Sequence, residues 1–264
     1  MIIDFHVHCF SDDIAEKAIT TLSKCGNIPA RTDGTLAGIR QSMKKAGVGK
    51  SVIMNIATKP GQVVKINRWA MSISSDDIIP FGTVHPGFED WENELEIIRE
   101  AGLKGIKLHP DYQEFYVDSP ELFPIYEKAA ELGLVVLFHA GLDIGLPPPY
   151  HCTPGRMRNV VRAFPEAKLV AAHMGGYDYW DEVERCLAGE NLYFDTSYSL
   201  HRMSRDQFLR IVSRHGFDKI LFGTDSPWKD QSEEVERLLG MKLPGDAADA
   251  ILGGNAARLL GLTW

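Results

Sequence analysis

The chain opens with the stretch Met1-Ile2-Ile3-Asp4-Phe5-His6-Val7-His8, in which an apolar strand ends in two histidines. Side chains alternate along a strand, so His6 and His8 point to one face, about 6–7 Å apart along the backbone. Val7 then points to the opposite face, as a buried strand position should. Two imidazoles in this arrangement can bind one metal ion, about 2.0–2.1 Å from each nitrogen if the ion is zinc. A core strand with two histidines by chance is the competing interpretation, and the ends of the other strands decide between the two.

Short apolar strands alternate with amphipathic helices along the rest of the chain. This alternation is typical of a parallel sheet covered by helices, and eight strands favour a closed (β/α)8 TIM barrel of the α/β class over an open sheet. We expect one domain over residues 1–264. The first interval between strands is nearly twice the later ones, which predicts a helical insertion after strand 1, starting with a helix over 12–23. The strands predicted after the first are residues 51–56, 78–84, 105–109, 134–139, 168–173, 192–196 and 219–225.

The composition narrows the range of partners. A net charge of -8 argues against nucleic acid or an anionic membrane surface as the main partner. The longest apolar runs are strand-sized and too short to span a bilayer. The start of the chain has no basic stretch followed by an apolar run, as a signal peptide would. The four cysteines are scattered and form no disulfide framework. We therefore expect a cytoplasmic protein that acts on a small molecule.

Chemically active residues gather at the predicted strand ends. In a TIM barrel the active site lies at the carboxyl ends of the strands. The fourth predicted strand ends in Lys107 and His109, the fifth in His139, the sixth in His173 and the eighth in Asp225. Histidines scattered through a core or a surface would not be sorted in this way. The pattern therefore predicts a metal site at this end of the barrel.

The substrate is specified less well. Arg31 and Arg156 stand on predicted loops or helix starts of the active face, where either could hold a substrate carboxylate. For each of them a solvated surface charge is the competing interpretation. Trp228 follows the eighth strand and could form a wall of the pocket. These residues predict a small substrate that carries a carboxylate.

The ordered set of motifs resembles the metal-dependent amidohydrolase superfamily. The chain is most similar to the amidohydrolase-2 branch, which includes the aminocarboxymuconate-semialdehyde decarboxylase-like proteins. The resemblance spans essentially the whole chain, and its motifs are specific for the superfamily but not for one reaction. The matching stretches are Asp-Phe-His-Val-His at 4–8, Gly-Ile-Lys-Leu-His-Pro at 105–110, His-Ala-Gly at 139–141, the segments 164–176 and 193–197, Leu-Phe-Gly-Thr-Asp-Ser-Pro at 221–227, and Gly-Asn-Ala-Ala-Arg-Leu-Leu at 254–260.

This resemblance implies a ligand set and two catalytic residues. His6, His8, His139 and Asp225 would ligate a divalent metal, with zinc the expected ion. A bound Zn²⁺ can lower the pKa of its water from 15.7 to about 7, which supplies hydroxide at neutral pH. Asp225 would also accept a proton from that water. His173 would orient the water or carry a proton, or would be a further ligand.

Lys107 leaves two interpretations open. In some binuclear members of the superfamily a carboxylated lysine at the matching place bridges two metals. A plain lysine could instead hold a substrate carboxylate, and we favour one ion over two. His109, two residues further along, would lie at the rim and contact the substrate. Members of such families often dimerise, so the resemblance also implies a homodimer.

Three reactions fit this pattern. The first is hydrolysis of a small carboxylated amide, ester or lactone by metal-activated water. The alternative is a non-oxidative decarboxylase, a carbon–carbon lyase that uses the same site, because one constellation can support either chemistry. A TatD-like deoxyribonuclease ranks behind both. Such proteins carry a glutamate at the end of strand four, where this chain has Lys107, and the net charge of -8 argues against a DNA substrate.

Overall fold

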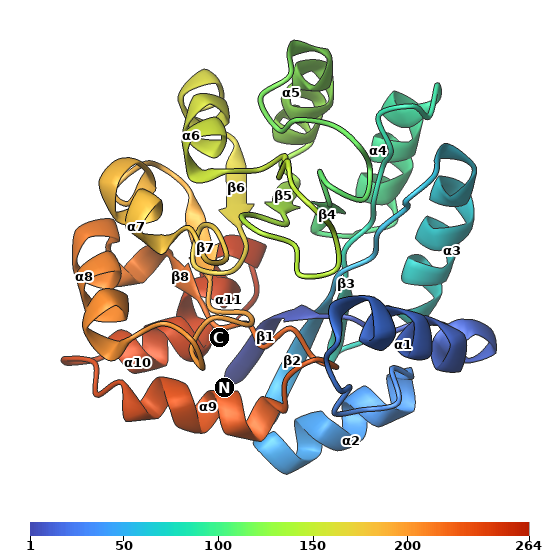
Figure 1. The fold of residues 1–264 in the computed structure, drawn as a ribbon. Helices are drawn as coiled ribbons and strands as arrows, with labels where there is room; N and C mark the ends of the chain where they lie inside the picture. The colour runs from blue at the N-terminus through green and yellow to red at the C-terminus, as the bar shows by residue number, and fades with distance from the viewer. Residues whose placement is uncertain (264) are drawn as a thin grey trace.

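Eight parallel strands form the centre of the fold, and helices surround them (Figure 1). The computed structural model describes residues 1–263. The second predicted strand lies three residues earlier than expected, and the later ones are all shorter than predicted, the third and the eighth most of all. The strands are β1 (Ile2–Val7), β2 (Val48–Ile53), β3 (Ile78–Pro80), β4 (Gly105–Leu108), β5 (Val135–Phe138), β6 (Lys168–Ala171), β7 (Tyr193–Asp195) and β8 (Ile220–Leu221).

The helices alternate with the strands, as predicted. Within residues 1–263, no helix combines the length and the apolar character needed to cross a bilayer. The helix between β6 and β7 begins as one α-helical turn, α7, and continues as the π-helical segment Val183–Leu187. The helices are α1 (Asp12–Gly26), α2 (Leu36–Ala46), α3 (Val63–Ile73), α4 (Trp91–Glu100), α5 (Phe123–Glu131), α6 (Pro154–Ala163), α7 (Trp180–Glu182), α8 (Arg205–His215), α9 (Gln231–Gly240), α10 (Ala247–Asp249) and α11 (Asn255–Leu260).

Two seams close the strands into a barrel. The hydrogen-bonded strands form two sheets, one in the order β1, β2, β3 and the other in the order β4, β5, β6, β7, β8. A bridge between Gly82 and Ile106 connects β3 to β4. At the second seam the Phe5 N–H donates to the Phe222 carbonyl at 2.7 Å and the Asp225 N–H donates to the His6 carbonyl at 2.8 Å. The predicted TIM barrel is therefore confirmed.

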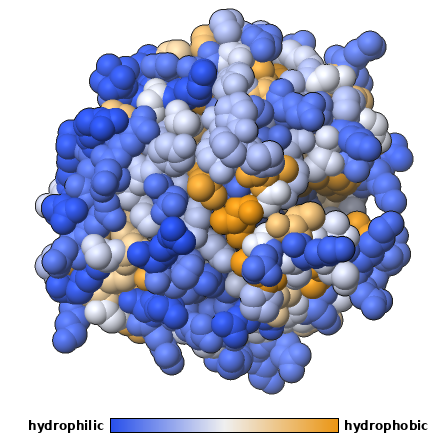
Figure 2. Space-filling view, viewed as in Figure 1, coloured by the Kyte–Doolittle hydropathy of each residue, from blue (hydrophilic) through white to orange (hydrophobic). Residues whose placement is uncertain are grey.

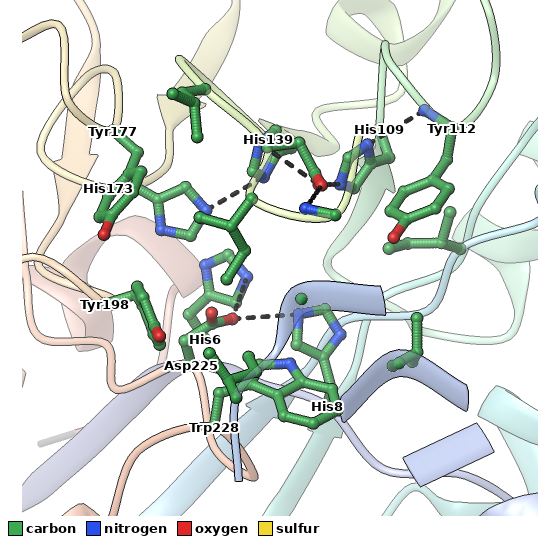
Figure 3. A pocket seen from close by; sticks show the side chains of 18 of the residues that line it. His6, His8, His109, Tyr112, His139, His173, Tyr177, Tyr198, Asp225 and Trp228 are labelled. Atoms are coloured by element: carbon green, nitrogen blue, oxygen red, sulfur yellow. Dashed lines mark hydrogen bonds and ion pairs between the residues drawn. The ribbon is translucent and has the colours of Figure 1, made fainter. Parts of the chain in front are cut away.

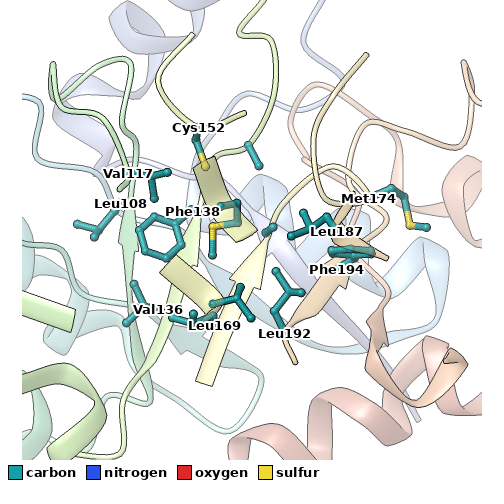
Figure 4. Close-up of a cluster of buried hydrophobic side chains, with 14 of the residues drawn as sticks. Leu108, Val117, Val136, Phe138, Cys152, Leu169, Met174, Leu187, Leu192 and Phe194 are labelled. Carbon is teal, nitrogen blue, oxygen red and sulfur yellow. The ribbon is translucent and has the colours of Figure 1, made fainter. Parts of the chain in front are cut away.

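The strands separate two apolar layers. In β5, Leu137 belongs to the cluster inside the barrel, together with Phe5 and Val52. Phe138, the next residue, belongs to the outer cluster between the strands and the helices (Figure 4). This alternation is expected of strands buried on both faces. Leu260 of α11 joins the inner cluster, so this last helix packs against the barrel interior.

The predicted insertion after strand 1 is α1. The next helix, α2, packs on β2 as a barrel helix does, through Ile39 and Met43. Helix α1 buries only Ala15 of its own length. Its last turn instead contributes Leu22 and Gly26 to the lining of a pocket. The insertion therefore serves the active face of the barrel more than its core.

A buried carboxylate holds the second seam together. Asp4 of β1 is fully buried and accepts hydrogen bonds from the Thr224 N–H at 2.9 Å, the Thr224 hydroxyl at 2.6 Å and Gln231 Nε2 at 2.7 Å. It also accepts one from the His6 N–H at 3.2 Å. Burial raises the pKa of Asp4 to about 6, although these hydrogen bonds oppose the rise. One side chain thus connects the first strand, the segment after β8 and the start of α9.

We expect Asp4→Ala to lower the free energy of unfolding by about 2–4 kcal/mol, because each buried donor left without an acceptor costs about 1–3 kcal/mol. Urea denaturation at pH 7.5, followed by circular dichroism, measures the change. Asp76→Ala, at an exposed acidic residue, is the control and should change the value by less than about 0.5 kcal/mol. Equal stability of Asp4→Ala and wild type would show that the seam does not depend on Asp4.

Candidate active site

A pocket gathers side chains from the carboxyl ends of the strands and from the loops that follow them (Figure 3). It holds about 740 Å³ of space, open solvent at its mouth included, which is room for a small organic molecule. Figure 2 shows apolar side chains gathered around a hollow at the centre of one face. The polar lining residues are His6, His8, Lys107, His109, His139, Asp143, His173 and Asp225; the apolar and aromatic ones include Leu22, Ile28, Ile56, Tyr112, Leu142, Ile144, Tyr177, Tyr198 and Trp228.

Three of these residues form what we call the first metal group: His6, His8 and Asp225. Asp225 Oδ1 lies 3.4 Å from His6 Nε2 and 3.2 Å from His8 Nε2. A register shift in the β1–β2 pairing, between Asp4 and Val7, precedes this point. Such irregularities often redirect side chains next to active sites. Phe5 faces the barrel interior, whereas His6 and His8 both line the pocket.

The Nδ1 atoms of His6 and His8, which do not face Asp225, form hydrogen bonds with other residues. His6 Nδ1 donates to Asp195 Oδ2 at 2.8 Å, and His8 Nδ1 donates to the Met54 carbonyl at 3.1 Å. A neutral imidazole has one proton, so these contacts leave the lone pair of each Nε2 directed toward Asp225. Partners of this kind fix the ring orientation of metal ligands.

The electrostatics of the first metal group suit a divalent ion. Burial, together with the positive charge of Lys107, lowers the pKa of His6 to about 4, so this imidazole is neutral. Burial acts to raise the pKa of Asp225, but the neighbouring imidazoles of His8, His6 and His173 outweigh it and hold that pKa well below its usual value. Two imidazole nitrogens and an ionised carboxylate, within 4.8 Å of one another, form a donor set that zinc and related divalent ions accept.

Lys107 lies beside this group. Its side chain is almost fully buried, and its Nζ is 3.4 Å from His6 Nε2. Burial lowers the pKa of Lys107 to about 8. Among the described residues that line the pocket, Lys107 is the only lysine or arginine. A negatively charged group that enters the pocket therefore meets its positive partner here, next to the first metal group.

His173 follows β6 in an unusual backbone conformation. Its φ of 58° lies in the left-handed region, which costs energy for a residue other than glycine and is found most often at functional sites. The His173 N–H donates to Asp195 Oδ1 at 3.0 Å. Its Nδ1 lies 3.0 Å from the Ser197 carbonyl, and its Nε2 lies 3.1 Å from His139 Nδ1. Asp195 thus holds His6 through the ring and His173 through the backbone.

His139 lies in a second group, with His109 and Asp143. The rings of His139 and His109 are stacked, with centroids 4.1 Å apart and planes 9° apart. Asp143 Oδ2 is 3.2 Å from His109 Nε2 and 3.8 Å from His139 Nε2. Burial lowers the pKa of both histidines well below its usual value. His139 thus lies beside His109 and Asp143, and its predicted membership of the ligand set with His6, His8 and Asp225 stays a prediction.

Two of the predicted substrate contacts do not reach the pocket. The Arg31 side chain is about half exposed and lies 3.9 Å from Glu233. Arg156 pairs with Asp118 at 2.6 Å and lies over the Tyr116 ring. Arg156 is thus paired outside the pocket, and Arg31 lies half exposed near Glu233, so the structure gives their predicted substrate role no support. The other predicted contacts, Trp228, Lys107 and His109, do line the pocket.

Sequence reasoning assigned no role to two acidic residues of the site. Asp195 is the last residue of β7 and is fully buried. The rule that active residues stand at strand ends could have identified it. Asp143 follows His139 by four residues, in the glycine- and proline-rich loop after β5. An acidic residue so close to a candidate ligand was a signal that could have been used.

The sequence matches a known family over nearly its full length. The family described as Amidohydrolase matches residues 3–262. Among solved structures, an uncharacterized TIM-barrel protein from Bordetella bronchiseptica superposes with a TM-score of 0.79 at 21% identity, over 98% of both chains. A dihydroxybenzoic acid decarboxylase from a Polaromonas species, with bound manganese and the inhibitor 2-nitroresorcinol, superposes with a TM-score of 0.74 at 15% identity, over 98% of this chain and 96% of that one. At these identities, the two structures show the fold alone.

A curated relative is similar in sequence. It is the 2-amino-3-carboxymuconate-6-semialdehyde decarboxylase of Dictyostelium discoideum, which is 26% identical over 208 residues. The match covers 62% of this chain but only 55% of that protein. The two chains are therefore similar over about half the length of the relative.

We expect Asp195→Asn to weaken metal binding by about 10–100-fold while the protein stays folded, because loss of the partner that holds a metal-ligating histidine typically has this effect. The asparagine side-chain oxygen can still accept from the backbone N–H groups that Asp195 holds. The amide nitrogen then faces His6 Nδ1 and cannot accept its proton. Zinc titration of chelator-stripped protein, followed by calorimetry, measures the affinity. Asp77→Asn, at a surface carboxylate paired with Arg40, should bind zinc as the wild type does. Unchanged affinity in Asp195→Asn would contradict this role.

Proposed function

Because the chain belongs to the amidohydrolase family, we propose that it is a metal-dependent non-oxidative decarboxylase of a small carboxylated, ring-bearing substrate. Hydrolysis was the first expectation from the sequence and decarboxylation the alternative. The named relatives are decarboxylases, so they support the alternative better. Both expectations fit the amidohydrolase family, and they differ in which bond of the substrate is broken.

One observation carries the proposal: a single buried cation stands beside a metal group in a pocket with apolar walls. Lys107 and the first metal group provide a place for one carboxylate. Tyr177, Tyr198 and Trp228 line the same pocket and supply faces for a flat apolar body. A substrate with a carboxylate at one end and an unsaturated ring at the other satisfies both parts.

The residues of the site have separable roles in this reaction. When held by the first metal group, a divalent ion supplies positive charge that polarises a substrate oxygen. Lys107 orients the carboxylate by a charge-assisted hydrogen bond. As the carbon–carbon bond breaks and CO₂ leaves, the bonding electrons stay on the ring carbon, and that carbon takes a proton that comes from solvent and is relayed by His173 Nε2. Asp195 and Ser197 hold the His173 backbone and ring in place for this transfer.

Two divalent ions, zinc and manganese, are candidates for the first metal group. Zinc is the expected ion from the sequence resemblance, and the manganese in the Polaromonas decarboxylase supports manganese as the alternative. Both ions accept imidazole and carboxylate ligands. The size of the pocket supports a small-molecule substrate.

The test is release of CO₂ from a panel of dihydroxybenzoates and related carboxylated rings, with product identity checked by mass spectrometry. We expect turnover with at least one member, loss of activity after chelation, and recovery on addition of zinc or manganese. Ester and lactone analogues are run in parallel. Hydrolysis of these analogues without CO₂ release from any acid would overturn the decarboxylase proposal in favour of hydrolysis.

We expect Lys107→Met to lower kcat/KM on the substrate found by about 10–100-fold, which corresponds to the roughly 1.5–3 kcal/mol of a hydrogen bond to a charged group. Lys128→Met is the matched control, because the Lys128 side chain is only 17% exposed, pairs with Glu96 at 2.6 Å and does not line the pocket. Steady-state kinetics of both variants measure the effect. Equal losses in the two variants would argue against a specific role for Lys107.

A further inference from the structure

A second pocket, which we call the basal pocket, lies at the other end of the barrel, at the amino ends of three neighbouring strands. Among the residues that line it, Lys104 directly precedes β4, Leu134 directly precedes β5, and Lys168 is the first residue of β6. The pocket holds about 530 Å³ of space, open solvent at its mouth included. It shares no lining residue with the active-site pocket. The basal pocket is therefore a separate hollow with room for a small ligand.

The charged side chains that line the basal pocket are all positive. They are Arg99, Lys104, Lys168 and Arg258, and no aspartate or glutamate is among the described residues of its lining. The chain as a whole has 36 acidic and 28 basic residues, so four positive charges in one hollow are not a sample of its average surface. The basal pocket thus has a local charge opposite in sign to that of the whole protein.

The protein itself supplies only neutral partners to these charges. Lys168 Nζ donates to the Gly133 carbonyl at 3.3 Å. Arg258 Nη2 donates to a backbone carbonyl at 2.7 Å and to Asn255 Oδ1 at 2.9 Å. The other two basic side chains of the pocket form no hydrogen bond or ion pair within residues 1–263. All four positive charges are therefore without a carboxylate partner in the part of the chain that the structure describes.

The carboxyl ends of helices account for only part of this charge. Arg99 and Arg258 lie in the last turns of α4 and α11, where positive side chains commonly stabilise the helix dipole. Gly133 lies just beyond the end of α5. Because each helix end carries about half an elementary negative charge, three ends offset only about 1.5 of the four positive charges. The remaining surplus favours an anion with more than one charge.

The register of the strands sets the spacing of the two lysines. Gly105 and Lys168 both pair with Val135 of β5, from its two sides. Lys104 stands next to Gly105, so the two lysines flank the start of β5, about 10 Å apart across two strand spacings. The long side chains of both lysines can therefore reach a single small ligand that lies between them.

We propose that the basal pocket binds a diphosphate group, as the free ion or as part of a nucleotide. Its four cations come from separate segments, so they approach a ligand from several directions. The tetrahedral oxygens of a phosphate accept donors from such directions, whereas a carboxylate accepts them near one plane. Arginine forks bind phosphate oxygens in pairs, and lysines supply point charges. Two linked phosphates match the surplus charge and the spacing of the lysines better than one phosphate does.

The experiment measures binding of inorganic pyrophosphate to the full-length protein by calorimetry. We expect one equivalent to bind with a Kd below about 1 mM, and binding to weaken as the salt concentration rises. The double variant Lys104→Gln/Lys168→Gln should bind at least about 10-fold more weakly, because two charge-assisted hydrogen bonds are lost. ADP is titrated in parallel. Tighter binding of ADP would support a nucleotide as the source of the diphosphate, and tighter binding of pyrophosphate would support the free ion.

Lys17→Gln/Lys44→Gln is the matched control, because both lysines are exposed, line neither pocket and remove the same charge. Lys44 also lies in the last turn of a helix, α2, so the control tests whether positive charge at a helix end is sufficient. This variant and Lys107→Met, in the active-site pocket, should bind pyrophosphate as the wild type does. Thermal unfolding checks that each variant is folded, and pyrophosphate should raise the Tm of the wild type more than that of Lys104→Gln/Lys168→Gln.

Four results would overturn the basal site. The first is no saturable binding of either ligand to the wild type. The second is equal weakening in the control and in Lys104→Gln/Lys168→Gln, which would show non-specific attraction. The third is loss of binding in Lys107→Met alone, which would place the anion in the active-site pocket. The fourth is tighter binding of citrate, a multivalent carboxylate, than of both diphosphates. None of these results bears on the proposed reaction, because the basal pocket contains no residue of the active site.

Discussion

The buried carboxylate of Asp4 lies where the first and last strands of the barrel meet, and the metal ligands lie on both sides of the same seam. His6 and His8 come from β1, whereas Asp225 follows β8. The Asp225 N–H also donates to the His6 carbonyl across this seam. Closure of the barrel and assembly of the first metal group are therefore one structural event. A ligand that binds across the seam should stabilise the closed barrel, because metal binding and folding share their free energy.

Positive and negative charges lie at different places in the pocket built on this seam. Lys107 provides positive charge beside the first metal group, and Asp143 provides negative charge near the stacked rings of His109 and His139. Apolar and aromatic side chains line much of the remaining surface. Asp195 supports this arrangement from outside the pocket, since it contacts both His6 and His173. A substrate with different groups at its two ends would be held in one orientation only.

Strand alternation and the rule that barrel sites lie at strand ends predicted much of the fold and part of the site. From the sequence alone, these two rules predicted that His6, His8 and Asp225 lie together. They could not show that His139 would face Asp143, because that depends on the conformation of a long loop. Arginine positions were harder still: Arg31 and Arg156 have long side chains, and the acidic residues that pair with them come from distant segments. The short length of β8 also escaped prediction, because its apolar sequence continues into the turn that positions Asp225.

Helix α1 gives the pocket part of its apolar rim, through Leu22 and Gly26, while the polar groups come from the strand ends and the loops after β5, β6 and β8. Part of the apolar rim and the reactive groups thus come from separate stretches of the chain. Helix α1 buries only Ala15 of its own residues, so its sequence can drift with little effect on the barrel. Evolution could therefore exchange the insertion, and with it the range of molecules admitted, while the chemical machinery stays intact. The same separation makes α1 the natural segment to randomise when the enzyme is adapted to new compounds.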